Sequence, residues 1–281
     1  MSKEKKVEQQ YLVSPINNKV LNYNVYVMVL WEKILYMILF FIAGGAVGLI
    51  FYGGLFKSDG VTTTATYISN GIVFCGVGLL ACKIFMPLRT EQLRKKRIGK
   101  LRKQFVEFLS ALTTSLSSGM NVTDSLYSAL QDLTVQFTEK SLIVQEVNEI
   151  LAGIENNVDV ETMLQNFGER SGISDVSNFA KVFSVCFRTG GNLKEIVRRT
   201  SDVISEKVAI SEEIETKLTS NKTQFKAMNV IPIILVLMLR TMSSQFAASF
   251  ASIIGVIAMT IAVGIFIAAY RIGTKISDIK G

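Results

Sequence analysis

Apolar residues are concentrated near both ends of this chain, and a region of regular apolar and polar alternation lies between them. Residues 34–56 contain no charged side chain and are long enough to cross a bilayer, which takes roughly 20 apolar residues as a helix. Residues 67–86 form a second run, and Pro87 is expected to end that helix. Gly44 and Gly48 are four residues apart, so they permit close helix approach, with a seam between two copies as one alternative.

The C-terminal apolar region is less regular. Residues 246–270 form a clear span, whereas residues 227–239 are apolar but short and are followed by Arg240. Two antiparallel spans with a turn near Ser243 would return the basic C-terminus to the cytoplasm. The alternative is a three-span layout in which residues 227–239 are only half inserted.

The central region, residues 103–226, shows the 3.6-residue period of amphipathic helices throughout. Helix, glycine, a few polar residues and a newly capped helix follow one another at three places, which begin at Gly119, Gly153 and Gly190. This weak repeat predicts three helical hairpins packed as one six-helix bundle. No strand alternation is visible, so the fold class is predicted to be all-α.

The clearest of these hairpins lies at residues 174–204. Six apolar positions form one stripe of its first helix: Val176, Phe179, Ala180, Phe183, Cys186 and Phe187. Ser174 is the expected N-cap of that helix, and Gly190 and Gly191 end it, because glycine adopts the left-handed conformation without steric cost. Asn192 is the expected cap of the next helix.

The net charge of +7 is not distributed evenly. Residues 105–226 contain 17 acidic and 11 basic side chains, whereas residues 88–104 contain eight basic side chains and only Glu91 as an acid. A nucleic-acid-binding domain would carry basic charge across its folded surface. Here the charge directly follows an apolar span, as the positive-inside rule expects of a cytoplasmic flank. Residues 1–33 lack the pattern of a signal peptide, and residues 25–30 are either an interfacial helix or an extension of the first span.

The sequence therefore predicts an all-α integral membrane protein whose cytoplasmic six-helix bundle is flanked by two transmembrane hairpins. Its expected parts are a cytoplasmic or interfacial segment (1–33), a transmembrane hairpin (34–86), a cytoplasmic helical domain with a basic juxtamembrane flank (87–226), and a C-terminal transmembrane hairpin with a short cytoplasmic tail (227–281). Both termini and the main domain are expected in the cytoplasm.

Signs of catalysis are missing. The chain has no histidine, which is the commonest general base and a common metal ligand, and it has no P-loop, GxSxG, HExxH or zinc spacing. Its three cysteines form no CxxC pair and are expected to be small buried hydrophobes. We expect neither enzymatic activity nor a cofactor or metal, and few ionisable groups lie in the spans to support an ion pathway.

Two turns carry a resemblance to a known family. Residues 116–126 read Leu-Ser-Ser-Gly-Met-Asn-Val-Thr-Asp-Ser-Leu, and residues 187–193 read Phe-Arg-Thr-Gly-Gly-Asn-Leu. With two spans before the helical domain and two after it, this resembles the type II secretion system F-domain family, most closely the Tad (tight adherence) pilus platform proteins TadB and TadC. The family often has a glutamate at the position of Arg188. The metal binding suggested for that carboxylate in relatives is therefore not expected here.

The resemblance implies a platform protein of the inner or plasma membrane. Such a protein couples a hexameric secretion ATPase to the lifting of pilin subunits into a filament, and it assembles with a second F-domain protein or with itself. We expect partner contacts at the basic flank and at the two turns, that is at Arg94, Lys95, Lys96, Arg97, Gly119, Asn121, Asp124, Arg188, Thr189, Gly190, Gly191 and Asn192. Helix capping and, for the flank, topology and anionic lipid attraction are the competing explanations. A membrane-anchored scaffold and a permease subunit are the alternative functions.

Overall fold

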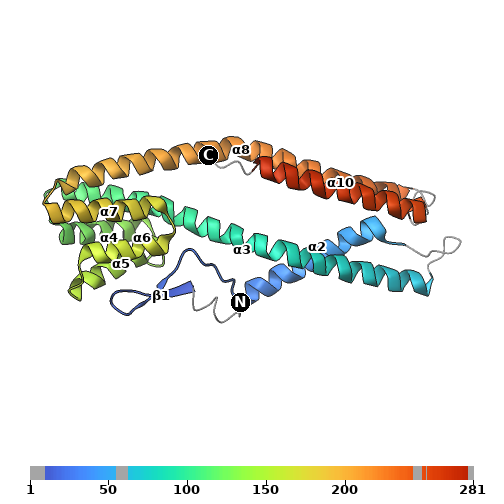
Figure 1. Cartoon of the computed structure of the whole chain (residues 1–281), viewed down its shortest axis with the longest axis horizontal. Coiled ribbons are helices and arrows are strands. Elements are labelled where there is room, and N and C mark those ends of the chain that lie inside the picture. The colour runs from blue at the N-terminus through green and yellow to red at the C-terminus, as the bar shows by residue number, and fades with distance from the viewer. Residues whose placement is uncertain (1–9, 55–62, 243–248, 251, 278–281) are drawn as a thin grey trace. The chain divides into compact units, whose positions relative to one another are not determined.

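The computed structural model describes residues 10–54, 63–242, 249–250 and 252–277 (Figure 1). The chain forms two compact units, one of Met1–Val27 with Thr90–Ser211 and one of Met28–Arg89 with Glu212–Gly281. Two helices, α3 (Thr64–Ser117) and α8 (Leu193–Met242), contribute residues to both units. Each unit is therefore built partly from helices that continue into the other.

The first unit is the helical bundle. Between α3 and α8 lie α4 (Val122–Gln136), α5 (Leu142–Glu155), α6 (Val160–Ser171) and α7 (Ser174–Thr189), which Figure 1 shows in green and yellow. Asn192 occupies the capping position before α8 as predicted, whereas Ser174 is already the first helical residue of α7. Asn121 caps α4. Among the described residues, helix dominates, and the pattern missed one short antiparallel pair, β1 (Tyr11–Val13) and β2 (Lys19–Leu21).

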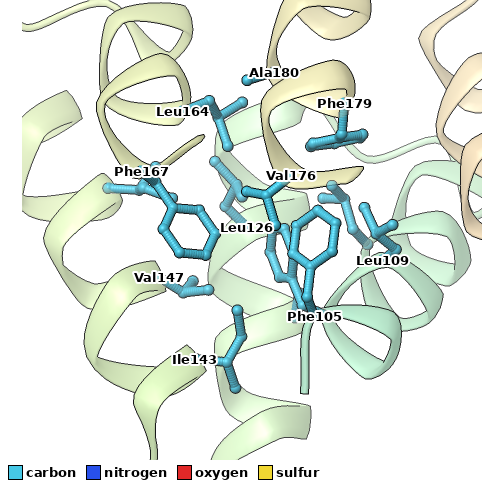
Figure 2. Packing of buried hydrophobic residues seen from close by; sticks show 14 of the residues in the cluster. Phe105, Leu109, Leu126, Ile143, Val147, Leu164, Phe167, Val176, Phe179 and Ala180 are labelled. Carbon is cyan, nitrogen blue, oxygen red and sulfur yellow. The ribbon is translucent and has the colours of Figure 1, made fainter. Parts of the chain in front are cut away.

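Phe105 of α3 occupies the centre of the bundle core. Its side chain is fully buried, and its ring lies 5.7 Å from that of Phe179 on α7 and 6.1 Å from that of Phe167 on α6, both edge-on (Figure 2). All of the helices from α3 to α8 contribute to this one cluster. The predicted stripe of α7 is buried except for Phe187, which remains 41% exposed while stacking on Phe183.

A charged contact joins three helices beside this core. Asp175 lies in the first turn of α7, and its carboxylate is almost buried. Lys207 Nζ of α8 lies 2.7 Å from Asp175 Oδ1, and Arg102 Nη2 of α3 lies 3.5 Å from Asp175 Oδ2. The acid in the first turn also suits the positive end of the α7 dipole. The carboxylate of Asp175 is thus paired with basic side chains of both α3 and α8.

The second unit contains the apolar helices. Three helices are long and apolar enough to cross a membrane: α2 (Leu30–Tyr52), the apolar part of α3, and residues Ile254–Gly273 within α10 (Ile253–Ser277). The apolar end of α8, Ala227–Met242, is shorter than these. The predicted polar turns at residues 57–60 and 243–245 lie outside the described residues. The choice between three and four spans therefore stays open.

Pro87 does not end a helix, contrary to our expectation. The helix α3 continues through it and contains the whole basic flank. A proline removes one helical hydrogen bond, but the thirteen residues that follow are mostly good helix formers, and their continuation carries Leu101 and Phe105 into the core. The segment that leaves the second apolar run is thus helical rather than a break.

Glycines of α2 pack against α3 within the same chain. A Cβ placed on Gly48 would lie 2.9 Å from Val77 Cβ, and Gly45 faces the ring of Phe74. The rings of Phe41 and Phe74 meet edge-on at 5.4 Å across the same contact. The close approach that the small residues predicted is therefore made inside the α2–α3 pair.

Polar contacts gather at the C-terminal end of α2. Arg240 Nη1 of α8 donates to Leu49 O at 3.0 Å, Tyr52 Oη donates to Thr260 Oγ1 of α10 at 3.2 Å, and Gly54 N donates to Asn70 Oδ1 of α3 at 2.9 Å. An arginine at this place also complements the negative end of the helix dipole. The contacts bring the end of α8 and the beginnings of α3 and α10 to the same end of α2.

The close contact between α6 and α7 provides a test of the bundle. A Cβ on Gly168 would lie 3.0 Å from the backbone Cα of Ser177, whereas a Cβ on Gly99 of α3 would meet nothing within 4 Å. We expect Gly168→Val to lower the free energy of unfolding by about 1–3 kcal/mol through overpacking. The control Gly99→Ala should raise it by about 0.5–1 kcal/mol, because alanine favours the helix. Thermal unfolding of the full chain in detergent would measure both, and equal shifts would contradict this packing.

Candidate functional site

The two turns that the sequence singled out lie at one end of the bundle. Lys194 Nζ, at the start of α8, donates to Ser117 O at the end of α3 over 3.5 Å. Arg188 Nε, at the end of α7, lies 3.4 Å from Glu161 Oε1 in the first turn of α6. We call residues 117–124 and 188–195 the turn end. The fold therefore joins two sequence motifs that are 70 residues apart into one surface.

The first turn is a satisfied helix cap. Gly119 has a φ of +85°, which suits glycine, and it lies two residues after the end of α3. Asn121 Oδ1 accepts from Asp124 N at 2.8 Å, and Asn121 Nδ2 donates to Asp124 Oδ2 at 2.7 Å. Both polar atoms of the Asn121 amide are thus used within the turn, so its capping role has direct structural support.

The second turn is also a helix cap, and its capping residue, Asn192, is exposed. Gly190 ends α7 with a φ of +68°, and Gly191 N donates to Cys186 O at 2.9 Å. Asn192 Oδ1 accepts from Glu195 N at 3.2 Å, while the residue itself is exposed. Hydrogen bonds from Arg199 and Arg198 lower the pKa of Glu195 from its usual value, so this edge of the turn keeps a paired carboxylate. Thr189 Oγ1 donates back to Val185 O at 2.9 Å.

A groove of about 550 Å³ opens beside the second turn, between α7 and the first turn of α8. Its floor and walls include exposed valines: Val182 is 43% exposed and Val185 is 64% exposed. The full lining is Lys181, Val182, Val185, Cys186, Thr189, Gly191, Asn192, Glu195 and Ile196. Such a surface can accept apolar side chains of a protein partner, with a cation on one wall and a carboxylate on the other.

The groove residues were not among the predicted contacts. A signal existed, because Lys181, Val182 and Val185 recur at helical spacing on α7 outside its core stripe. Nothing in the sequence indicated that α8 would stand beside them to form a second wall. As to chemistry, no group of three or more His, Cys, Asp or Glu side chains that could hold a metal ion occurs among the described residues.

The basic flank is separate from the turn end. Arg97 and Ser117 lie on the same helix α3 and are 20 residues apart, which corresponds to roughly 30 Å at the helical rise of 1.5 Å per residue. Two predicted contact regions therefore cannot form a single small interface. Any one partner that contacts both would have to extend along the length of α3.

The four predicted residues of the flank also differ from one another. Arg94 makes a two-pronged pair with Glu91, at 2.9 Å from Nε and 2.7 Å from Nη2, and the hydrogen bond from Arg94 lowers the pKa of Glu91. Arg97 is half-buried and binds backbone carbonyls of the N-terminal segment. Lys95 and Lys96 are exposed. Only the two lysines present their charge outward in the way that a surface contact requires.

Substitutions of Asn192 would separate capping from partner contact. Asn192→Ala should destabilise the bundle by about 1 kcal/mol through loss of the cap, whereas Asn192→Asp should keep the cap and nearly the full stability. Thermal unfolding of the full chain would give both values. If partner contact needs the amide of Asn192, the Asp variant should be stable yet defective in partner recovery. A stable Asp variant with normal recovery would leave capping as the role of this residue.

Comparison with known proteins identifies one family for the helical domain. Residues 108–241 match the model of the family described as Type II secretion system (T2SS), protein F. The match includes the turn end and the groove, and it extends along α8 to Thr241. Searches of the curated proteins and of the solved structures found no match. The domain that holds the turn end and the groove is therefore similar to protein F of type II secretion systems, which supports the family that the two turns predicted.

Proposed function

We propose that this chain is a multi-pass platform protein of a Tad-type or related type IV-like pilus or type II secretion machine. In this role it couples a cytoplasmic hexameric secretion ATPase to the extraction of pilin subunits from the membrane and to filament assembly. It performs no catalysis of its own. The match to protein F of secretion machines covers α4 to α7 and nearly all of α8, so it includes the turn end and the groove, and it supports this proposal.

The continuity of α3 and α8 carries this proposal. One end of each helix is fixed in the bundle core, by Phe105 in α3 and by Val197 and Ile204 in α8. The other end of each is apolar and largely exposed, as expected of a surface that faces lipid or other membrane helices. A helix without a break transmits displacement and rotation along its axis, so movement imposed on the bundle reaches both apolar ends.

The expected topology is consistent with the contacts of the second unit. The end of α8 and the beginnings of α3 and α10 meet at the C-terminal end of α2, which supports a layout of four antiparallel segments. Exposed Lys95 and Lys96 follow the apolar part of α3 on the other side. The positive-inside rule then favours a cytoplasmic bundle with both termini in the cytoplasm, and it makes anionic lipid a partner of the lysines.

The turn end and its groove are the proposed contact for the ATPase or for a second F-domain protein, and self-association is the alternative there. The apolar parts of the second unit are the proposed contact for pilin helices. Nucleic acid is not expected as a partner, because the bundle is acidic and its basic residues are confined to one flank. A membrane-anchored scaffold or a permease subunit of another transport complex is the competing function.

Two exposed valines offer a matched test of the groove. We expect Val185→Asp, in the groove, to reduce recovery of a secretion ATPase or second F-domain protein at least tenfold, because an unpaired charge would enter an apolar contact. Val135→Asp, on α4 and 91% exposed, should leave recovery unchanged. The measurement is gentle detergent extraction of the tagged full chain from its host, followed by quantitative mass spectrometry of the proteins that co-purify.

Membrane levels and thermal unfolding of both variants serve as controls, because a folding defect would lower recovery without any change in the interface. Equal recovery with the two variants would exclude the groove as the contact. Recovery of a solute-binding protein or a nucleotide-binding transporter subunit, without a pilus or secretion ATPase, would overturn the platform function and favour the permease.

A further inference from the structure

The groove between α7 and α8 begins where the charge of the bundle changes sign. Residues 105–180 contain eleven acidic and two basic side chains, and one of the two basic side chains, Arg170, is buried. Residues 181–199 contain five basic side chains and one acidic side chain, Glu195. Lys181, the first of these basic residues, lines the groove. An otherwise acidic sequence therefore concentrates basic residues in the segment that forms the groove.

The carboxylates on the α8 side of the groove are already paired. Glu195 accepts hydrogen bonds from Arg199 Nε at 2.6 Å and from Arg198 Nη2 at 3.2 Å. Arg198 Nη1 also lies 3.7 Å from Asp202 Oδ2. The side chains of both arginines are nevertheless more than half exposed. Because a guanidinium has five N–H donors, each arginine can bind a further carboxylate from outside.

The other basic side chains leave an excess of positive charge. Arg188 meets the buried carboxylate of Glu161, and its own side chain is 69% exposed. Lys194 donates to the backbone carbonyl of Ser117. Among the described residues, no carboxylate pairs with Lys181 or Lys194. Charge complementarity therefore favours a partner that brings carboxylates to the groove.

An apolar stripe on α8 continues from the groove. Ile196 lines the groove, and Val203 and Ile210 follow it at intervals of seven residues, which is close to two helical turns. Val203 is 64% exposed and Ile210 is 50% exposed. The three side chains share one side of α8 and extend over roughly 21 Å at the helical rise of 1.5 Å per residue. A surface of this length suits a helix better than a single inserted side chain.

We propose that the groove binds an acidic amphipathic helix of a partner protein. Apolar side chains of that helix, at positions i, i+3 or i+4 and i+7, contact Val182 and Val185 in the groove and the stripe on α8. Its carboxylates pair with Lys181 on the α7 side and with Arg199 on the α8 side. The proposal rests on the proposed function in taking the groove as a partner contact, and it adds the chemistry of the partner.

Three designed helical peptides can measure this preference. Each has roughly 18 residues, about five helical turns, and is held helical by side-chain staples. The peptides share one leucine stripe and differ only in the flanking residues, which are glutamate, glutamine or lysine. Fluorescence anisotropy would measure their binding to the full chain in nanodiscs of phosphatidylcholine, with empty nanodiscs as background. We expect the glutamate peptide to bind at least tenfold more tightly than the lysine peptide, and the difference to shrink as salt is raised.

Two matched pairs of variants locate the site. Lys181→Glu should weaken binding of the glutamate peptide about tenfold and strengthen binding of the lysine peptide, because it reverses the charge of one wall. Lys140→Glu, at an exposed lysine between α4 and α5, should change neither. Val185→Asp should weaken all three peptides, whereas Val135→Asp should weaken none. Thermal unfolding of each variant shows that its fold is kept.

Several results would overturn the proposal. One is equal binding of the three peptides, and another is binding of the glutamate peptide that neither Lys181→Glu nor Val185→Asp weakens. Dimers of the full chain that Lys181→Glu dissolves and Lys140→Glu does not would assign the groove to a second copy. Displacement of the glutamate peptide by vesicles of phosphatidylglycerol, but not by vesicles of phosphatidylcholine, would assign it to anionic lipid.

The recovery experiment with Val185→Asp distinguishes failure of this proposal from failure of the platform function. If Val185→Asp lowers recovery of a secretion ATPase while the three peptides bind equally, the partner chemistry is wrong and the platform function stands. If the glutamate peptide is preferred while only a solute-binding protein or a transporter subunit is recovered, the platform function fails and the chemistry of the groove stands.

Discussion

The structure depends on one helix meeting two requirements at once. The ring of Phe105 in α3 is surrounded by aromatic rings from α6 and α7, and this packing anchors the bundle. The first part of the same helix is apolar and exposed, and exposure of that surface to water would be unfavourable. The helix α8 has the same two parts in the opposite order, because its first part contributes to the bundle core and its last part is apolar.

The charged residues between these two ends are divided by chemistry. Arginines make contacts within the chain. Arg94 pairs with Glu91, Arg97 donates hydrogen bonds to the N-terminal segment, and Arg102 pairs with Asp175. A planar guanidinium can bind several acceptors at once, which suits such contacts. Lysines such as Lys95 and Lys96 face outward, where a flexible and strongly hydrated ammonium is favoured. A run that reads as uniformly basic therefore has two functions, one inside the molecule and one at its surface.

The surfaces available to partners follow from the same framework. The turn end lies roughly 30 Å along α3 from Arg97, so the capped turns and the outward lysines are independent contact regions. The groove between α7 and α8 adds apolar surface next to the caps. A protein that docks at the turn end would therefore meet the capped turns and the apolar groove together, without contacting the outward lysines.

The sequence alone determined the helices, their caps and the apolar segments, because these depend on residues three or four positions apart. The stripe of Val176, Phe179 and Phe183, the caps at Asn121 and Asn192, and the left-handed glycine at Gly190 all follow from local periodicity and backbone sterics. Tertiary structure alone decided which distant groups meet. No local pattern pairs Tyr23 with Glu146 or brings Arg97 to the carbonyls of the N-terminal segment. Nor does one bring Ile196 and Val185 to the same groove. Pro87 was expected from the sequence to end the helix, yet α3 continues through it. Burial of Leu101 and Phe105 further along the helix outweighs the one hydrogen bond that the proline removes.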